Sequence, residues 1–545
     1  MSFTKRTIRG QPLRTKIVCT LGPASRDQGM IERLIDAGMS VARLNMSHGT
    51  HAVHQETFDA VRAGAEARNR PIAVMVDLCG PKIRLSEIEG GSLTLATGSS
   101  VDFVRGVAPG TKDELTCSYD GFLDDVEVDE PVFINDGAVR LTVVRKATDR
   151  VTCSVDVGGV ISSRKGINLP GTRISSPSLT DKDIRDLEFG VGLGADLFAL
   201  SFVRSAEEVK DLRSRLQALG SNAQIVSKIE KPQALKDLEA IIEASDAVMV
   251  ARGDLGIELP VETVPLHQKH IVRACHEALK PVIVATQVLE SMIEHPTPTR
   301  AEVSDIANAI EDGCDALMLS AETAAGKYPI EAVETMARVC RDVEKVLTVK
   351  AAPEDFIGRR AGDALRKAMV IGAAIIAEPL GAKFIVVRSE SGVTARYLSK
   401  VRGHCPILAV HHEASVLRRH ALMWGVLAVQ TTAEHGELPP MEDDLRQLAR
   451  SILEEGAGQH LRPDRCSQPL PMGRAASTEQ HTYAESRRCA GGSALAEQVG
   501  QAAVVFRDLL FFAGHVGQQH GLHGGALQPR KLAVVTTLQQ IIGGI

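Results

Sequence analysis

Short apolar runs alternate with amphipathic stretches along most of the chain, from about residue 15 to residue 346. The runs read KIVCTL, SVARLNM, IAVMVDL, LFALSFV, QIVSKI, AVMVARG, PVIVATQV and ALMLSAE. Eight such runs, separated by stretches with helical periodicity, predict a parallel (β/α)8 TIM barrel. A doubly wound sheet would give a similar alternation, but the count of eight and the polar residues that end nearly every run favour the barrel.

The alternation is interrupted after DLCGPKIRL, where residues 86–169 follow a different pattern. The runs there are SLTLATG, SVDFVRG, EPVFIND, AVRLTVV and RVTCSVD, which are short, rich in Val and Thr, and separated by turn residues. They predict a small β-barrel inserted between the third strand and its helix. A domain carried on two linkers above the barrel mouth is placed to act as a lid. Thr180, which opens TDKDIRDL, suits the N-cap of the helix that restarts the barrel pattern.

A third α/β stretch begins near residue 356. A helical run at 363–376 precedes AKFIVVRS, GVTARYLSKV precedes PILAVHH, SVLRRHALMWG precedes VLAVQTT, and MEDDLRQLARSILEEG follows. This order predicts a C-terminal α/β domain with a mostly parallel sheet. We place the barrel at 1–85 together with 170–350, the lid at 86–169, the C-terminal domain at 351–455 and a divergent tail at 456–545.

Composition narrows the function classes. The 545 residues exceed what one core supports, and the formal net charge of −6 gives no reason to expect a nucleic-acid or membrane-surface protein. One Trp and four Tyr leave few stacking platforms for single strands. The ten cysteines contain no CxxC, the N-terminus lacks an apolar signal region, and no run of 18 apolar residues occurs, so we expect a cytoplasmic protein with free thiols.

The stretch from residue 227 to residue 258 carries the strongest chemical signal. It opens SKIEKPQAL and closes MVARGDLGIE, and its pattern is strand (224–229), helix (232–244), strand (247–250). Lys228 and Glu230 end the first strand, and Gly253 and Asp254 follow the second, so they meet where a barrel places its chemistry. Two carboxylates suit Mg²⁺, and a lysine suits a phosphoryl group in transit. A surface lysine–glutamate pair beside a glycine turn is the plainer alternative.

These motifs resemble those of pyruvate kinases. SKIEKPQAL, MVARGDLGIE, ATQVLESM and ALMLSAETAAGKYP carry the resemblance, as do TKIVCTLGPAS and ARLNMSHG nearer the start, and it extends from about Arg14 to Glu455. It implies Mg²⁺-dependent transfer of the phosphoryl group of phosphoenolpyruvate to ADP, with pyruvate and ATP as products, in glycolysis. Mn²⁺ would substitute for Mg²⁺, and the assembly would be an allosteric homotetramer.

The catalytic residues follow from the resemblance and from their positions. Arg43, Asn45 and Ser47 alternate as the second strand ends, so their side chains share one face. By resemblance the catalytic residues are Arg43, Lys228, Thr286 and Ser320; the substrate is held by Arg43, Gly253, Asp254 and Thr286; and Mg²⁺ is held by Glu230 and Asp254. Proton delivery to the enolate, through water from Thr286 or Ser320, stays open.

The remaining assignments rest mainly on the resemblance. It places a monovalent-cation pocket at Asn45, Ser47, Asp77 and the backbone of Leu78, nucleotide contacts at Pro23, His48, Arg84 and Lys165, and a sugar-phosphate effector loop at Ser389, Ser391, Gly392 and Thr394. Asp136, in a turn of the lid, would face the metal on closure. The bland alternative for the effector loop is an ordinary helix N-cap, and for the cation pocket a polar cap on a strand.

Lys82 bears on the monovalent cation. Family members that require K⁺ carry glutamate at the position of Lys82, whereas members that do not require it resemble this chain, with apolar residues where Leu78 and Leu85 stand. A tethered ammonium supplies positive charge in that region without an ion to recruit. The resemblance therefore implies that K⁺ is not required.

The resemblance fails after Glu455. The family pattern predicts two more strands, but the chain reads GAGQHLRPDRCSQPLPMGRAASTEQHTYAESRRCAGG, in which Pro463, Pro469 and Pro471 oppose a regular element. Our hypothesis is a frameshift in the coding sequence near codon 456. A genuine but divergent tail is the alternative.

Two other functions compete with pyruvate kinase activity. A barrel lyase that uses phosphoenolpyruvate or pyruvate could share the metal site, but it would not need the lid or the nucleotide contacts. A catalytically inactive regulatory protein would need a lost site residue, and every site residue that can be placed is intact. We therefore expect an active pyruvate kinase, impaired at most by the altered tail.

Overall fold

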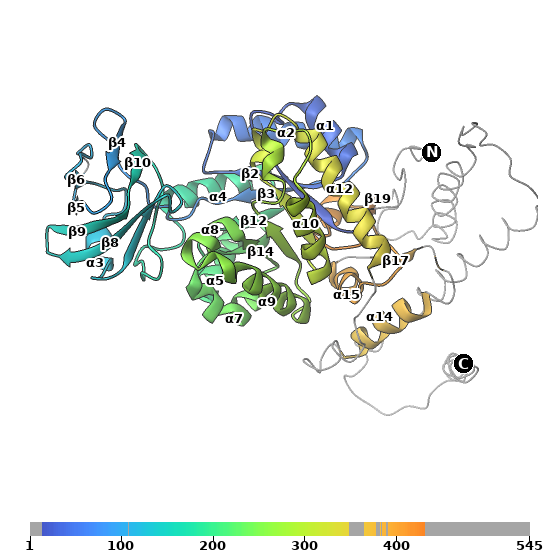
Figure 1. The fold of residues 1–545 in the computed structure, drawn as a ribbon. Coiled ribbons are helices and arrows are strands. Elements are labelled where there is room, and N and C mark those ends of the chain that lie inside the picture. The colour runs from blue at the N-terminus through green and yellow to red at the C-terminus, as the bar shows by residue number, and fades with distance from the viewer. Residues whose placement is uncertain are drawn as a thin grey trace, which may run out of the picture.

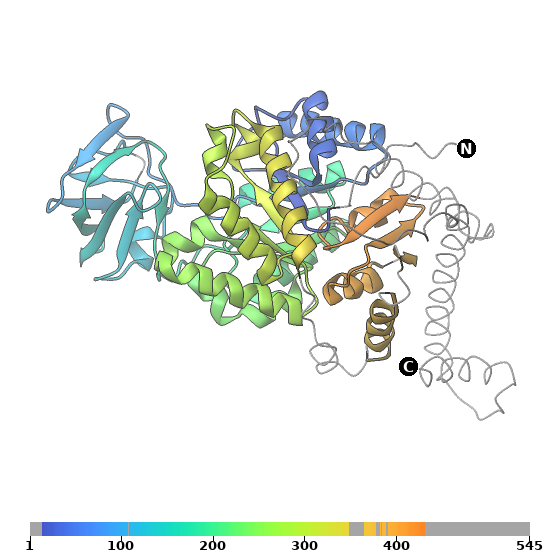
Figure 2. The same cartoon turned by 45° about the vertical axis from the view of Figure 1, so that its right-hand side comes forward.

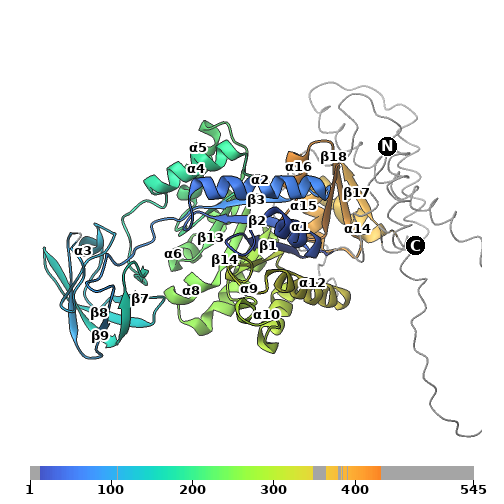
Figure 3. The ribbon, with the colours of Figure 1, turned by 90° about the horizontal axis from the view of Figure 1, so that it is seen from above.

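The computed structural model describes residues 13–106, 108–347, 364–377, 382, 384–388 and 391–430. Within these residues the barrel lies in the middle, the lid at one end and the C-terminal domain at the other (Figure 1). The same order is seen after a quarter turn, from above (Figure 3). The expected helix at 441–456, the tail at 456–545 and Ser389 lie outside the described residues.

The predicted barrel is confirmed as a closed parallel sheet in the order β1-β16-β15-β14-β13-β12-β3-β2. All eight apolar runs form its strands: β1 (Lys16–Thr20), β2 (Met39–Asn45), β3 (Ala73–Asp77), β12 (Leu197–Leu200), β13 (Gln224–Ile229), β14 (Ala247–Ala251), β15 (Val282–Ala285) and β16 (Ala316–Leu319). Nearly every residue in them is buried, because helices cover the outside of the barrel and side chains fill its interior.

An outer ring of helices covers the strands. Its α-helices are α1 (Gln28–Ala37), α2 (His51–Ala67), α4 (Asp181–Leu193), α5 (Ala206–Ala218), α6 (Pro232–Lys236), α7 (Leu238–Ala244), α8 (Arg252–Glu258), α9 (Val264–Glu277), α10 (Arg300–Asp312), α11 (Ala321–Ala324) and α12 (Pro329–Val346). Two 3-10 turns, η1 (Val261–Thr263) and η2 (Glu290–Ile293), join them. Their apolar faces and the outward-facing side chains of the strands form one continuous core, while the inward-facing side chains form a second cluster inside the barrel.

The single helix expected at residues 232–244 is wrong in one respect, because the structure breaks it into α6 and α7 at Asp237. Asp237 has φ −109° and ψ 21°, outside the helical region. Its carboxylate accepts a hydrogen bond of 2.8 Å from the backbone N–H of Ala206, at the start of α5. Asp237 therefore binds the first turn of α5, and its own helix is interrupted at this position.

The lid contains the expected short strands and several shorter ones. Its elements are β4 (Ser92–Leu95), β5 (Ser100–Val104), β6 (Glu114–Leu115), α3 (Phe122–Asp125), β7 (Pro131–Ile134), β8 (Val139–Lys146), β9 (Arg150–Val157), β10 (Gly159–Ser162) and β11 (Ile167–Asn168). They form a six-stranded sheet, β11-β7-β8-β9-β5-β6, and a two-stranded sheet, β10-β4. Both sheets enclose one separate core that includes Phe103 and Phe122.

The chain re-enters the barrel at α4, as the sequence predicted. Thr180 is the N-cap, and Thr180 and Asp183 form a reciprocal capping box. The buried Asp183 carboxylate also accepts the backbone N–H of Gly80 at 3.1 Å. Gly80 belongs to the linker that leaves the barrel for the lid, so the two linkers are joined at the barrel surface.

The C-terminal domain packs at the amino ends of the barrel strands (Figure 2). Its described elements are α14 (Ala364–Ala377), β17 (Ile385–Arg388), α15 (Val393–Val401), β18 (Ile407–His411), α16 (Ala414–Arg418) and β19 (Val426–Gln430), with β17-β18-β19 parallel as predicted. Leu422 enters the cluster of side chains inside the barrel. Lys400 and Arg402 both pair with the fully buried Asp315, which directly precedes β16.

Candidate active site

The predicted catalytic side chains gather at the carboxyl ends of the barrel strands. Arg43 lies near the end of β2, Asp77 ends β3, and Lys228 and Glu230 lie at the end of β13. Asp254 follows β14 in the first turn of α8. Because parallel strands end at the same rim, residues far apart in the chain become neighbours there.

Lys228 is the centre of this group. Its Nζ lies 2.9 Å from Glu230 Oε1 and 3.5 Å from Asp77 Oδ1, and it donates to Ser201 Oγ at 2.8 Å. Burial by itself lowers the pKa of Lys228, but the charges of Asp77 and Glu230 outweigh it and raise the pKa above its ordinary value. The ammonium is therefore firmly charged and fixed in position.

Arg43 is held by two partners. Its Nε and Nη2 lie 2.7 and 2.6 Å from Asp77 Oδ2, and Nη1 donates to Thr20 Oγ1 at 2.8 Å. Burial alone would raise the pKa of Asp77, but the charges of Lys228 and Arg43 outweigh burial and lower the pKa below its ordinary value. The Asp77 carboxylate therefore stays ionised. The Nε–Nη2 edge of the guanidinium faces Asp77, which leaves only the remaining N–H groups of Arg43 for a phosphoryl group.

Glu230 has one satisfied and one available oxygen. Its Oε2 accepts the backbone N–H of Phe202 at 2.6 Å, while Oε1 faces Lys228 as an ion pair and is buried without a hydrogen bond of good geometry. The pKa of Glu230 is raised, mainly by burial and additionally by the negative charge of Asp254. A cation between the two carboxylates would relieve this repulsion.

The donor set fits Mg²⁺ better than a fully protein-ligated metal. Among the described residues no group of three or more His, Cys, Asp or Glu side chains is arranged around a common point. Mg²⁺ is usually bound by one or two carboxylates plus water and substrate phosphate, which is what Glu230 and Asp254 offer.

Gly253 and Thr286 lie together, as expected, but they already contact each other. The backbone N–H of Gly253 donates to Thr286 Oγ1 at 2.7 Å, and that hydroxyl donates to the Ala285 carbonyl at 2.6 Å. Thr286 has φ +67°, an unusual backbone for a β-branched residue. Ser320 follows β16, and its backbone N–H donates to the buried Glu322 at 2.7 Å.

The residues predicted to form a monovalent-cation pocket also lie together and have protein partners. Asn45 Oδ1 accepts the backbone N–H of Ser47 at 3.1 Å. The carbonyl of Leu78 accepts Ser201 Oγ at 2.7 Å, and Asp77 is shared by Lys228 and Arg43. Tethered groups of the protein therefore satisfy much of this pocket.

The nucleotide candidates lie on the lid linkers and in the turns after β1 and β2. Arg84 and Lys165 lie on the two linkers, where Leu85 donates its N–H to the Lys165 carbonyl at 2.8 Å. Burial, with the positive charges of Arg84, Lys82 and Arg43, lowers the pKa of His48 below its ordinary value. Pro23 is exposed in the turn after β1, and Asp136 is exposed at the tip of the β7–β8 turn with φ +55°.

The described part of the effector loop forms the start of α15. Gly392 is the N-cap with φ +78°, a conformation that favours glycine. A side chain there would also meet His420 and Met423 at 3.5 Å. Ser391 is exposed and Thr394 lies in the first turn of the helix, half-buried.

Sequence reasoning missed Ser201 and Phe202, which follow β12. The Ser201 hydroxyl accepts from Lys228 and donates to Leu78, and it is nearly fully buried. The run LFALSF did carry a signal, because a serine directly after a buried barrel strand reaches the catalytic rim. The role of Phe202 comes from its backbone, which side-chain patterns do not report.

A closed (β/α)8 barrel whose rim gathers a charged lysine, an arginine and three carboxylates defines a barrel enzyme for an anionic substrate. Sequence profiles of two families match the chain: "Pyruvate kinase, barrel domain" over residues 13–333 and "Pyruvate kinase, alpha/beta domain" over residues 367–460. The chain belongs to the pyruvate kinase family, so its reaction is phosphoryl transfer from phosphoenolpyruvate to ADP.

Individual relatives agree with the profiles. A pyruvate kinase of Mycobacterium tuberculosis is 43% identical over 444 residues, which are 81% of this chain and 92% of the relative. One of Sporosarcina psychrophila is 41% identical over 419 residues, 76% of this chain and 71% of the relative. The crystal structure of a pyruvate kinase from Cryptosporidium parvum matches with a TM-score of 0.78 and 34% identity, covering 83% of this chain and 95% of that one.

These matches support neither a barrel lyase nor an impaired regulatory protein. Members of the family generally require Mg²⁺. Among the described residues, no helix is both long enough and apolar enough to span a bilayer.

Proposed function

We propose that Lys228, Arg43, Glu230 and Asp254 carry out the phosphoryl transfer in this chain. The observation that carries the proposal is the network in which Lys228, Glu230, Asp77 and Arg43 fix one another at the rim, with no donor–acceptor distance above 3.5 Å. A lysine already charged and held in place can stabilise charge that develops in transfer without costly reorganisation. Positioning and electrostatics dominate phosphoryl-transfer catalysis.

Glu230 and Asp254 would hold Mg²⁺, with Mn²⁺ as a substitute. When bound, the metal supplies positive charge to the phosphoryl oxygens and to the substrate carboxylate. Two observations support this assignment: Glu230 Oε1 is buried without a hydrogen bond of good geometry, and Asp254 is half-buried. Lys228 then neutralises the oxygen of the enolate that remains after transfer, and Arg43 contacts the phosphoryl group through the N–H groups that Asp77 and Thr20 leave available.

Gly253, Asp254 and Thr286 would orient the substrate. The N–H of Gly253 is bonded to Thr286 Oγ1, so a carboxylate that takes this N–H must displace the hydroxyl. The released hydroxyl can then donate to the carboxylate. Thr286 and Ser320, through water, are our candidates for protonating the enolate carbon.

Arg84, Lys165, Pro23 and His48 would contact the nucleotide. Arg84 and Lys165 lie on opposite linkers of the lid, so a polyphosphate between them would bridge the linkers and favour closure. Closure would bring Asp136 towards the metal.

Lys82 would remove the need for K⁺. It is half-buried near Gly166 of the returning linker and close enough to His48 to lower the pKa of that histidine. We further propose a cytoplasmic homotetramer that binds phosphoenolpyruvate, ADP, ATP and pyruvate, with no nucleic-acid or membrane partner.

The test is Lys228→Met in a coupled assay of pyruvate formation from phosphoenolpyruvate, ADP and Mg²⁺. We expect a near-complete loss of kcat, because the Lys228 contact strengthens in the transition state. Lys327→Met is the matched control, since Lys327 is an exposed lysine paired with Glu294. If Lys228→Met keeps more than about a tenth of the wild-type kcat, a loss below roughly 1.4 kcal/mol, the role assigned to Lys228 is wrong.

A further inference from the structure

Phe202 has a backbone conformation that a phenylalanine rarely adopts. It follows β12 and Ser201, and its φ is +53°, in the left-handed region. For a bulky residue this conformation is a genuine outlier that persists only where the surroundings impose it. Phe202 is half-buried and lies in the turn that leaves β12, where two contacts depend on its conformation.

The first contact is with the proposed metal ligand. The left-handed turn aims the backbone N–H of Phe202 at Glu230 Oε2, with an N–O distance of 2.6 Å. This bond fixes the rotation of the carboxylate, so that the buried Oε1 faces Lys228. The strained backbone thus sets which oxygen of Glu230 is available.

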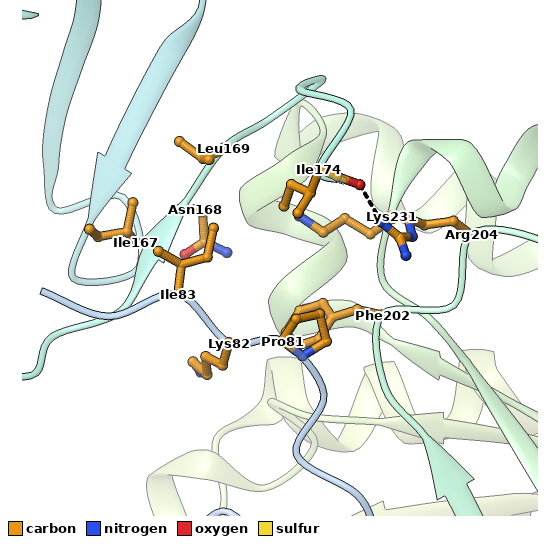
Figure 4. A pocket seen from close by; sticks show the side chains of 10 residues that line it. All are labelled: Pro81, Lys82, Ile83, Ile167, Asn168, Leu169, Ile174, Phe202, Arg204 and Lys231. Atoms are coloured by element: carbon orange, nitrogen blue, oxygen red, sulfur yellow. Dashed lines mark hydrogen bonds between the residues drawn. The ribbon is translucent and has the colours of Figure 1, made fainter. Parts of the chain in front are cut away.

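The second contact is with the lid linkers. A Cβ on Gly80 would lie only 2.8 Å from Phe202 Cδ2, so the ring packs directly on the linker that leaves the barrel. The ring also lines a pocket with residues of both linkers (Figure 4). The linker residues are Pro81, Lys82, Ile83, Ile167, Asn168, Leu169 and Ile174. On the barrel side, Lys231 Nζ lies 5.7 Å from the centre of the Phe202 ring.

We propose that Phe202 is a positioning residue that couples the lid linkers to the orientation of the Glu230 carboxylate. Its ring packs against the linker at Gly80 and Pro81, and its backbone N–H holds Oε2 of Glu230. A linker that moves on lid closure presses on the ring. Because the ring and the N–H belong to one strained residue, this movement also shifts the N–H that orients Glu230. The proposal rests on the proposed role of Glu230 as a metal ligand.

Three substitutions separate the ring from the backbone. Phe202→Gly removes the ring but tolerates positive φ, so the N–H can stay on Glu230. Phe202→Ala removes the ring contacts that impose the left-handed backbone but keeps the Cβ that disfavours it, so the residue should relax out of that conformation. Phe202→Leu keeps an apolar side chain of similar bulk against Gly80 and Pro81. Phe189→Ala is the control, since Phe189 is a half-buried phenylalanine of α4 that stacks on His51.

The first measurement is Mn²⁺ binding to the full chain without substrate, followed by electron paramagnetic resonance. We expect Phe202→Ala to raise the Kd for Mn²⁺ about fivefold, because Glu230 loses the bond that orients it. Phe202→Gly should stay within about twofold of wild type, because glycine keeps the backbone. Phe189→Ala should leave the Kd unchanged.

The second measurement is the rate of limited trypsin cleavage in the linkers, at Lys82, Arg84, Lys165 or Arg173. Phe202→Ala and Phe202→Gly should both speed this cleavage several-fold, since both remove the ring that packs on the linkers. Phe202→Leu should match wild type. The expected pattern therefore differs between the two assays. Phe202→Gly should resemble wild type in Mn²⁺ binding but resemble Phe202→Ala in linker cleavage.

Equal Mn²⁺ affinities for the alanine, glycine and wild-type proteins would overturn the coupling, as would cleavage rates insensitive to all three substitutions. Glu230→Gln distinguishes this failure from failure of the metal site. If Glu230→Gln weakens Mn²⁺ binding but Phe202→Ala does not, the metal role stands and the coupling is wrong. If Glu230→Gln binds Mn²⁺ like wild type, the metal assignment is wrong and the coupling falls with it.

Discussion

At the scale of single residues, the site is organised by charge balance. Lys228 is almost fully buried, which would normally favour its neutral form, yet Asp77 and Glu230 keep it protonated. Arg43 in turn keeps Asp77 ionised. Removing one member of such a buried set leaves an uncompensated charge, so each member has consequences for the others. This mutual dependence separates the site from an ordinary surface ion pair.

Asp254→Asn should weaken Mg²⁺ binding roughly tenfold or more, because the substitution removes a charged oxygen ligand. The dependence of the coupled assay on Mg²⁺ concentration measures this directly, with phosphoenolpyruvate and ADP held saturating. Asp211→Asn is the control, since Asp211 is an exposed aspartate paired with Arg215 on α5. A Mg²⁺ titration of Asp254→Asn that overlays wild type would rule out Asp254 as a ligand.

Lys82→Glu should create a dependence on K⁺ that the wild-type protein lacks. The substitution places a negative charge beside the proposed cation pocket, so a mobile cation must then restore the balance. Activity is compared in buffers containing only sodium or tetramethylammonium and after addition of K⁺. Lys82→Met is a useful control, since it removes the charge without reversing it. A wild-type protein that is inactive without K⁺ and rescued by it would contradict the prediction.

The sequence predicted which residues form the site better than it predicted the contacts that these residues make. Lys228, Glu230, Asp254 and Arg43 were identified because they lie at the ends of barrel strands and because their motifs resemble those of pyruvate kinases. That the N–H of Gly253 is occupied by Thr286 could not be read from the sequence, because it depends on rotamers of residues 33 positions apart. Their catalytic roles remain predictions.

At the scale of elements, the start of α4 connects the lid to the barrel. Thr180 and Asp183 cap the helix reciprocally, and Asp183 also holds Gly80 of the outgoing linker. This cap both starts the helix and holds the two linkers together. Its loss should therefore loosen the lid as well as the first turn of α4. The sequence predicted the cap from Thr180, but it gave no sign of the contact with Gly80.

Thr180→Ala should therefore cost about 1 kcal/mol of stability, as for other N-cap substitutions, and should also speed proteolysis of the linkers. Thr299→Ala is a close control, because Thr299 and Glu302 form the same capping box on α10, away from the lid. Differential scanning fluorimetry should show a lower midpoint for both variants, and only Thr180→Ala should alter linker cleavage by trypsin. Equal cleavage of the two variants would reject the link between the cap and the lid.

Element prediction succeeded where periodicity was long and failed where elements were short. The barrel strands stand out because burial on both faces makes each run continuously apolar. Three lid strands escaped prediction: β6 and β11 span two residues each, too few for a pattern, and β10 spans four. The break at Asp237 escaped because its cause is a hydrogen bond to Ala206, on another helix.

At the scale of the whole molecule, the C-terminal domain packs against one end of the barrel and the inserted domain lies at the other (Figure 1). Leu422 of the C-terminal domain fills the amino end of the barrel, and Lys400 binds Asp315 directly before β16. The strands β15 and β16 then lead to Thr286 and Ser320 at the catalytic rim. The sequence predicted the three domains but not this plug, because contacts between domains leave no periodic signal in either one.

The proposed effector loop lies at the start of α15, whose other end carries Lys400 and borders Arg402, so a ligand at Gly392 would act on a helix anchored to the barrel. By resemblance to the family, this loop supplies half of a sugar-phosphate site, and the other half falls after Gly456, where the sequence departs from the pattern. We therefore predict a weak or absent response to a phosphorylated sugar, measured as the coupled-assay rate at subsaturating phosphoenolpyruvate. Strong activation that Thr394→Ala abolishes would show that half a site suffices, and resequencing the gene around codon 456 would decide between a frameshift and a genuine tail.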